Sequence, residues 1–483
     1  MLAPQAASCS GRNAARWQPA PGRRLFLRTA PPQAAPRPAA ASSADPATPS
    51  TSSSSAPPLR PEDISIEVVP SIEAIGQPAW DAIATRVVSG TSAGEASGDN
   101  PFLFYAFLHA AEASRSVHPS TGWMAQHLVA KTPDGTVVGL APAYLKGHGA
   151  GEYVFDAAWA DAYERAGGRY YPKLLGAVPF SPVPGPRLLV VEDEADGSTP
   201  PGQADAVRTA LARGLAALTQ DLKLSSAHIN FTDPASSAAL AGAGVGFVER
   251  LGMQFHWTNR GYGTFADFEA ALKQPRRKTI RQERKKVAAA GLATARLPGS
   301  ELSPAFIDRF YSFYCDTAER KWGEAYFSRE FFHRLFDASG GGLPSDRVML
   351  VVAAPTTAPG TPGTGAASSV VAAALNLVGS DALFGRHWGA CPDAPFVNGL
   401  HFELAYYEAI EEAIARGLSR VEAGAQGGEF KIKRGYLPVL TRSAHFLRDP
   451  GLRDAVADFC AREAREIDYV ASVLGVRDNP YKE

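Results

Sequence analysis

Cysteine is scarce in this chain. Only four cysteines occur among its 483 residues, and no two of them form a Cys-x-x-Cys pair. That scarcity argues against a disulfide scaffold and against a structural zinc site, so we expect no bound metal. Long apolar runs are missing as well. Because no stretch of about 18 uninterrupted apolar residues occurs, the sequence gives no support for a membrane span or a membrane partner.

Acidic residues are nearly missing from the first 60 residues. That segment carries seven arginines and a single acid, Asp45, which leaves 41 basic and 48 acidic residues in the rest of the chain. The body is therefore mildly acidic. This balance argues against a general nucleic-acid binder, although it leaves room for a local basic patch.

The composition of residues 1–60, rich in alanine, proline, serine and arginine, predicts a disordered organelle transit peptide. A merely disordered tail would have the same composition. The longest apolar core, Leu25–Leu27, is too short for a secretory signal. The serine- and proline-rich tract Ala39–Pro58 favours the chloroplast, with the mitochondrion as the alternative.

The body of the chain repeats one order of elements: strands, then a helix, then a strand. In the first passage a helix over Ala204–Leu222 precedes a strand over Ser226–Phe231, and in the second a helix from His401 precedes a strand over Arg420–Gln426. The repetition predicts an internal duplication of a mixed α/β unit. We expect a first unit over residues 61–260, a second over 261–450 and a C-terminal helix over 451–483.

The strand after the His401 helix carries the strongest functional signal. Its alternation puts polar or small residues on one face, namely Arg420, Glu422, Gly424 and Gln426. A strand that directly follows a helix usually lies inside a sheet covered on both sides. Polar side chains need a reason to be there, and a ligand cleft is such a reason.

A glycine-rich loop and several cations follow that strand. Gly427 and Gly428 would let the backbone approach a bound group closely, and Lys431, Arg434 and Tyr436 come next. A positive charge at the mouth of a cleft suits a carbonyl, carboxylate or phosphate whose negative charge grows in the transition state. An ordinary surface loop of lysine and arginine is the alternative.

Further candidates for the site lie outside this loop. Glu403 lies in the first turn of its helix, where the helix dipole alone also favours an acid. His256 follows an aromatic residue, and such a histidine can equally be structural. Asn376 is the one polar residue of an apolar strand. Arg386 and His387 are consecutive on the next strand, so only one of them can face a given cleft.

The segment Lys273–Lys286 is the one strongly basic run of the body. On a helix, Arg277, Arg281 and either Arg284 or Lys285 would line one side. That side is either a solvated helical face or a clamp for the phosphates of a nucleotide, a coenzyme or an RNA-linked donor.

Several motifs in order resemble the Fem-like branch of the GNAT superfamily, in particular the group labelled peptidoglycan biosynthesis/recognition proteins. They are Asn100–Leu103 (NPFL), Thr121–Trp123 (TGW), Glu152–Leu174 (EYVFDAAWADAYERAGGRYYPKL), Phe255–Gly263, Arg276–Val287, His401–Tyr407 and Glu422–Pro438. The resemblance covers about residues 100–447. It implies an α/β fold of two tandem GNAT-like units, with an acyl or aminoacyl group transferred to an amine between them.

One loop departs from the family pattern. Residues Gly389–Gly399 lack the Arg/Gln-x-x-Gly-x-Gly/Ala signature with which acetyl-CoA-using relatives hold a pyrophosphate. An aminoacyl-tRNA donor would instead account for the basic helix. Acetyl-CoA, another acyl-CoA and aminoacyl-tRNA therefore all stay open as donors, and none is expected as a permanently bound cofactor.

These observations predict an N-acyltransferase or aminoacyltransferase acting on a small-molecule or peptide amine. Proton removal is assigned to Glu422 or Glu403, and donor or oxyanion charge to Lys431 and Arg434, with His256 and Asn376 orienting the substrate. The donor- and substrate-binding set is Arg277, Arg281, Arg284, Asn376, Arg386, Gln426, Arg434 and Tyr436. The alternative is a non-catalytic module that binds an anionic glycan or RNA.

Overall fold

The computed structural model describes residues 23–25, 59–86, 98–192, 202–357, 366–425 and 427–482. Most of the expected transit peptide, and the candidate Gln426, lie outside these ranges. Within the expected leader, Arg23–Leu25 forms strand β1, which pairs with β2 (Ser65–Val69).

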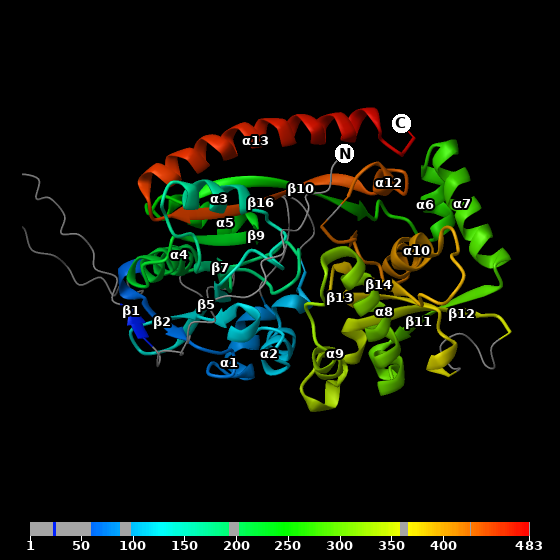
Figure 1. The fold of residues 1–483 in the computed structure, drawn as a ribbon, viewed down its shortest axis with the longest axis horizontal. Helices are drawn as coiled ribbons and strands as arrows, with labels where there is room; N and C mark the ends of the chain where they lie inside the picture. The colour runs from blue at the N-terminus through cyan, green and yellow to red at the C-terminus, as the bar shows by residue number, and fades with distance from the viewer. Residues whose placement is uncertain are drawn as a thin grey trace, which may run out of the picture.

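The described strands form two sheets (Figure 1). The smaller sheet has the order β1-β2-β4-β5-β8, with all neighbours antiparallel. Its remaining strands are β4 (His127–Lys131), β5 (Val137–Ala141) and β8 (Leu189–Val190). Pro142 separates β5 from β6 (Ala143–Lys146), which belongs to the larger sheet. A proline cannot donate to a strand ladder, so it suits this change of sheet.

The larger sheet has eleven strands in the order β11-β12-β13-β14-β15-β10-β16-β9-β7-β6-β3. On the first-half side the strands are β3 (Trp123–Ala125), β6, β7 (Lys173–Gly176) and β9 (Ser226–Thr232). On the second-half side they are β11 (Leu292–Pro298), β12 (Val348–Pro355), β13 (Ala372–Val378), β14 (Ala382–Ala390) and β15 (Arg420–Glu422). The described strand pairs include two that are parallel, β7 with β9 and β14 with β15.

Each parallel pair is joined by a helical crossover. Helix α4 (Gln203–Asp221) connects β7 to β9 by way of β8, and the helical segment 400–415 connects β14 to β15. The two halves therefore share one arrangement. This confirms the predicted α/β class with two tandem units.

Strands β10 (Val248–Thr258) and β16 (Leu437–Leu447) join the halves. Strand β10 pairs with β15 on one side and with β16 on the other, and β16 then pairs with β9 of the first half. Helix α13 (Pro450–Arg477) runs along β10 and β16 (Figure 1). The boundaries predicted at residues 260 and 450 stay predictions, since the sheet runs through both halves without interruption.

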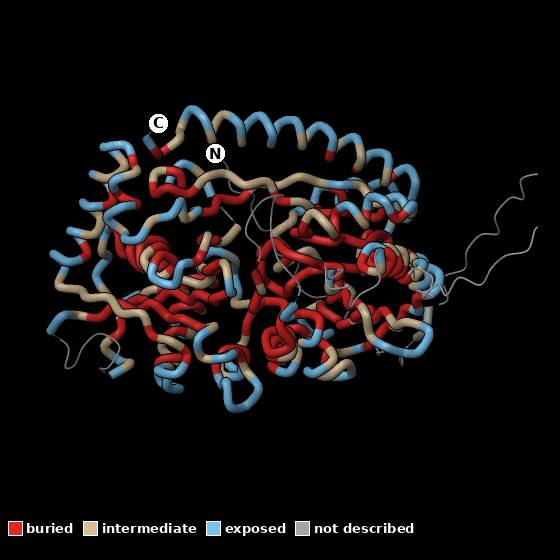
Figure 2. The backbone as a smooth tube through the Cα atoms, turned by 180° about the vertical axis from the view of Figure 1, so that it is seen from behind, coloured by how far each residue is buried: buried red, intermediate tan, exposed pale blue. Residues whose placement is uncertain are grey.

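The remaining helices cover the two halves. Those of the first half are α1 (Gln77–Ala84), α2 (Tyr105–Ala113), α3 (Ala157–Arg165) and α5 (Pro234–Gly242). Those of the second half are α6 (Phe265–Ala271), α7 (Gln274–Ala289), α8 (Pro304–Trp322), α9 (Arg329–Phe336) and α12 (Glu429–Ile432). Buried chain fills the middle of both halves, and exposed chain follows the outer helices (Figure 2). No helix in the described ranges is long and apolar enough to cross a bilayer.

The helix predicted from His401 is interrupted by one turn of π-helix. Helix α10 (Leu400–Phe402) continues as a π-helix over Glu403–Tyr407 and then as α11 (Glu408–Ala415). Gly417 follows with a φ of 68°, which fits the predicted helix end. The next strand is shorter than predicted, because β15 ends at Glu422 and Gly424 turns the chain away with a φ of 78°.

Candidate functional site

The candidate site lies where the parallel strands β14 and β15 separate. They pair from Ala382 to Phe384, after which β14 continues to Ala390 while β15 stops. A small cavity of about 50 Å³ occupies the opening. Its lining includes Asn376, Arg386, Trp388, His401, Tyr406 and Ala423. Ligands of open α/β sheets commonly bind at such a point.

Asn376 and Arg386 bring unsatisfied polar atoms to this opening. Both are buried, and neither Asn376 Oδ1 nor Arg386 Nε and Nη2 has a hydrogen-bond partner in the described part of the chain. The other guanidinium nitrogen, Nη1, donates to the carbonyls of Gly385 at 2.8 Å and Glu422 at 3.2 Å. A buried polar atom without a partner is costly, so these atoms are suited to a bound group.

Glu422 ends β15 beside Arg386 and does not itself line the small cavity in the described structure. Its Oε1 accepts from Arg420 Nε at 3.2 Å, and its Oε2 lies 3.7 Å from Arg386 Nη2 without a hydrogen bond among the described atoms. His256 on β10 is the cross-strand partner of Glu422, and its Nε2 lies 3.4 Å from Gln254 Oε1. Paired residues of neighbouring strands have side chains on one face, which places His256 beside Glu422.

Lys431 completes the polar cluster. Its Nζ is buried and donates to the carbonyls of Ala423 at 2.8 Å and Gly424 at 3.1 Å. Burial, and then the charge of Arg386, lower the pKa of Lys431 to about 7. A neutral lysine amine has two N–H donors and one lone pair. The two carbonyls therefore use both donors and leave the lone pair for a proton.

Three other predicted residues frame the site from further away. Glu403 turns toward α7, where Arg284 binds it at 3.0 Å, and burial raises the pKa of Glu403 to about 7. Arg434 is held by Glu283 and stacks 3.1 Å from the ring centroid of Phe402. Tyr436 is fully buried against Tyr406.

These contacts give Glu403, Arg434 and Tyr436 structural partners. None of the three lines the small cavity in the described structure, and their predicted roles stay predictions.

Arg386 and His387 both line the small cavity, so the prediction that only one of them can face a given cleft is wrong. The pairing of β13 with β14 shifts register at these two residues, and such a bulge breaks the strict alternation of side chains. The His387 ring packs 4.8 Å from Tyr314 and 5.7 Å from Phe327, on the side of α8. The Arg386 guanidinium lies 5.0 Å from the ring centroid of Phe102, which belongs to the same apolar cluster as Tyr314 and Phe327.

The basic helix α7 has two distinct sides. Arg277, Lys278, Arg281 and Lys285 line an open groove of about 390 Å³ with Gln274 and Gln282. Arg281 bonds Glu269 at 3.0 Å, with 67% of its side chain exposed. Arg284 turns inward to Glu403 and Glu411, so Lys285 takes the outer position.

Sequence reasoning missed Tyr153 of the first half as a member of the site. Burial raises the pKa of Tyr153, and the nearby charge of Arg386 offsets part of that rise. The two side chains therefore lie within electrostatic range of each other. Tyr153 also lines a groove of about 170 Å³ together with Gln254 and Ala425. Its φ of 61° is unusual for a residue with a side chain. The available signal was its place inside the Glu152–Leu174 motif.

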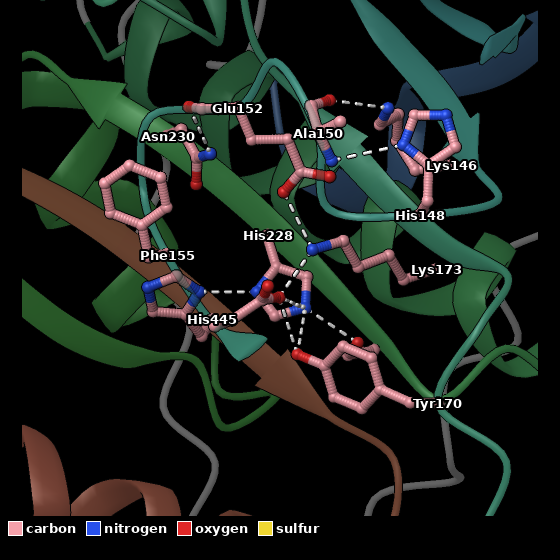
Figure 3. Close-up of polar contacts among 12 residues, drawn as sticks. Lys146, His148, Ala150, Glu152, Phe155, Tyr170, Lys173, His228, Asn230 and His445 are labelled. Atoms are coloured by element: carbon pink, nitrogen blue, oxygen red, sulfur yellow. Dashed lines mark hydrogen bonds and ion pairs between the residues drawn. The ribbon is translucent and has the colours of Figure 1, made fainter. Parts of the chain in front are cut away.

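A buried ionic network holds the Tyr153 loop (Figure 3). Lys173 of β7 binds Glu152 at 2.7 Å and also binds Asp156, so the carboxylates on both sides of Tyr153 share one ammonium. Tyr170 donates to Asp156 at 2.7 Å. Buried charges are tolerated when they are paired in this way. The network therefore fixes the loop that reaches toward Arg386.

A much larger cavity of about 990 Å³ adjoins the small one. Trp388 and His401 line both cavities, and their ring centroids lie 4.9 Å apart. The large cavity lies beneath residues 391–399, the loop that lacks the pyrophosphate signature.

Comparison with known proteins gives one strong match. A model of the FemAB-like family, described as peptidoglycan biosynthesis/recognition, matches residues 71–483. No curated protein matches this chain.

Solved structures with low similarity include three that each cover about four fifths of the chain. The crystal structure of FemX is 12% identical with a TM-score of 0.46, covering 79% of this chain and 98% of its own. A tandem GNAT protein from the clavulanic acid biosynthesis pathway is 14% identical with a TM-score of 0.39, covering 80% and 99%. A conserved protein of unknown function from Bacteroides thetaiotaomicron is 10% identical with a TM-score of 0.45, covering 79% and 99%.

Proposed function

We propose, from the premise that this chain belongs to the FemAB-like family, that it transfers an activated acyl or aminoacyl group to an amine. The reaction takes place at the opening between β14 and β15. The observation that carries this proposal is that Asn376 and Arg386 bring to this opening buried polar atoms without hydrogen-bond partners among the described residues, with Glu422 Oε2 3.7 Å from Arg386 Nη2. Such atoms are expected where a substrate completes the hydrogen bonding.

The chemistry assigns a step to each group. The amine nitrogen attacks the carbonyl carbon of the donor, and Arg386 Nε and Nη2 donate to the oxyanion that forms. Asn376 Oδ1 accepts from the amine and orients it, and the Glu422 carboxylate, 3.7 Å from Arg386 Nη2, positions that guanidinium. The neutral Lys431 takes the proton, since its pKa is lowered to about 7. Collapse of the intermediate forms the amide and expels the carrier as a thiol or a hydroxyl.

Two kinds of donor fit different parts of the molecule. The groove on α7 presents Arg277, Arg281 and Lys285, which suit the phosphates of an aminoacyl-tRNA. The large cavity beside Trp388 suits a smaller activated donor such as acetyl-CoA or another acyl-CoA. The acceptor is a small-molecule or peptide amine that approaches from the other side of the opening.

Equilibrium binding separates the two donors. Acetyl-CoA, charged tRNA and uncharged tRNA are titrated against the full chain, against Lys431→Met and against Arg281→Ala. Arg462→Ala is the control, because Arg462 is an exposed arginine of α13. Saturable CoA binding that Arg281→Ala and Lys431→Met both leave unchanged identifies a CoA donor, since Lys431 is assigned to the proton and not to the carrier. Preference for charged tRNA that only Arg281→Ala weakens identifies an aminoacyl donor, and binding of neither contradicts both.

The second candidate function is non-catalytic binding of RNA or an anionic glycan, which the exposed cations of α7 favour. If this second function is correct, replacing Arg277, Arg281 and Lys285 by alanine abolishes binding of RNA or of the glycan. Glu422→Gln then leaves that binding unchanged, and the wild type acylates no amine. Acylation of any amine by the wild type, together with its loss in Glu422→Gln, contradicts this second function.

Residues 1–60 are proposed to direct the protein to the chloroplast, on the composition of that segment. The test is a fusion of these residues to a fluorescent protein in plant cells. Fluorescence in mitochondria would support the alternative compartment, and fluorescence in the cytosol would contradict targeting.

A further inference from the structure

The large cavity lies at one end of the strands of the second half. It is bounded by the start of β11, the end of β12, the start of β13 and the end of β14, with α8 on one side. Its wall is mostly apolar and includes Leu292, Pro355, Val371, Trp388, Val397 and Phe402. At about 990 Å³ it is at the upper end of the range, roughly 300–1,000 Å³, that holds small-molecule ligands.

The small cavity limits what can react inside it. The small cavity has a volume of about 50 Å³, against about 990 Å³ for the large one, so the large cavity has far more room for an acyl chain. Any acyl group with a longer chain must extend past Trp388 and His401 into the large cavity. Burial lowers the pKa of His401 to about 4, so this passage is lined by two uncharged rings at neutral pH.

The rim of the large cavity carries a net positive charge. Asp316, Arg320 and Lys321 of α8 line it together, and Arg320 binds Asp316 at 2.6 Å. Lys321 makes no ion pair with any described residue, so its charge is left for a ligand. An anionic head group would complement it.

Phe396 stands at the mouth of the large cavity with 92% of its surface exposed. Single exposed apolar side chains are common and need no explanation by themselves. Here the exposed ring adjoins an apolar cavity, where it can cover an apolar ligand.

We infer that the large cavity binds the hydrocarbon chain of a medium- or long-chain acyl thioester, with a phosphate of the carrier at Lys321 and the thioester carbonyl beyond Trp388 in the small cavity. The inference rests on the proposed function and specifies its donor. The amine then displaces the thiol of the carrier: a C–N bond forms, the C–S bond breaks, and the proton passes from the amine to Lys431 and on to the thiolate.

A chain-length series tests this inference by isothermal titration calorimetry. CoA, acetyl-CoA, octanoyl-CoA and decanoyl-CoA are titrated into the full-length protein. Each fully buried methylene contributes about fourfold in affinity. We therefore expect octanoyl-CoA to bind at least about tenfold more tightly than acetyl-CoA, even if only two of the added methylenes are fully buried. Equal affinities for the two esters would overturn the inference.

Two variants locate the effect in the cavity. Phe396→Ser removes an exposed ring without disturbing the packing, and it should reduce the gain in affinity from acetyl-CoA to octanoyl-CoA. Val371→Trp fills the cavity and should abolish that gain, whereas Val470→Trp, at an exposed position of α13, should leave it unchanged. A gain that persists in both Phe396→Ser and Val371→Trp would overturn the inference. Lys321→Ala should weaken all four ligands by the same factor, and an unchanged affinity would overturn the placement of the phosphate.

The outcome also separates this inference from the proposed function. Tight binding of octanoyl-CoA without acylation of any amine supports the cavity and contradicts the transferase. If an amine is acylated from acetyl-CoA or aminoacyl-tRNA but acyl chain length has no effect on affinity, the transferase function is supported and the inferred role of the large cavity is overturned.

Discussion

Replacing Lys173 by methionine should destabilise the first half of the molecule strongly. The Lys173 ammonium is fully buried and is shared by Glu152 and Asp156, which are also buried. Methionine retains the length of the side chain and removes the charge. Two buried carboxylates would then lack a cation, and breaking such a buried pair costs about 3–5 kcal/mol in the free energy of unfolding.

Lys131→Met is the matched control. Lys131 on β4 binds Glu67 on β2 at 2.6 Å, but about a third of each side chain is exposed, at 32% and 29%. Surface pairs of this kind contribute about 0–1 kcal/mol. Urea unfolding followed by circular dichroism measures both variants against the wild type. A loss in Lys173→Met no greater than that in Lys131→Met would refute the reasoning.

The pH dependence provides an independent test of the same network. Burial alone would raise the pKa of Asp156, but its charged and hydrogen-bonding partners, Lys173 foremost, outweigh burial and hold this pKa below its usual value. The stability that Asp156 contributes is therefore present above about pH 4 and is lost as the pH falls further. In Lys173→Met the buried carboxyls would have raised pKa values, so the variant loses stability as the pH rises. The difference between the two proteins should therefore shrink from pH 8 to pH 5. A constant difference would contradict the assignment of the cost to unpaired carboxylates.

Three further changes test the site. If Lys431 is the proton acceptor, the transfer rate of the wild type should rise with pH through about 7. Lys431→Arg stays protonated and should therefore be about 10²–10⁴-fold slower. A rate unchanged in Lys431→Arg would assign Lys431 to charge stabilisation instead. Tyr153→Phe should slow transfer without changing the urea midpoint, whereas an unchanged rate would exclude the hydroxyl from the reaction. Arg284→Met should lower the free energy of unfolding by about 1–3 kcal/mol, because it leaves Glu403 without its cation. Lys285→Met should leave stability unchanged and weaken only tRNA binding. Equal stability of these two variants would contradict the two-sided description of α7.

Periodicity in the sequence predicted the elements that position the site. The helix from His401, the strand from Arg420 and the basic helix are all present, because apolar spacing reports which face of an element is buried. The early end of β15 was not predictable in the same way. It depends on the turn at Gly424 and on hydrogen bonds from Lys431 to two carbonyls of that turn, which are tertiary contacts.

Tertiary partners also decide which charged residues reach the site. Arg434 and Glu403 have the residue types that the chemistry needs, but Glu283 and Arg284 of α7 bind them. Tyr153 carries no periodic signal, and its approach to Arg386 depends on a loop fixed by Lys173. Strand β16 crosses to the first half to pair with β9, which no local pattern in the sequence specifies.

The central claim is that the opening between β14 and β15 catalyses acyl transfer to an amine. The most direct measurement is mass spectrometry of amine acceptors incubated with acyl-CoA or aminoacyl-tRNA and the wild type, Glu422→Gln or Glu429→Gln. Glu429 is an exposed acid of α12 and serves as the matched control. We predict acylated amine with the wild type and Glu429→Gln, and much less with Glu422→Gln, because the amide lacks the negative charge that faces Arg386. Equal product from all three proteins would contradict the claim.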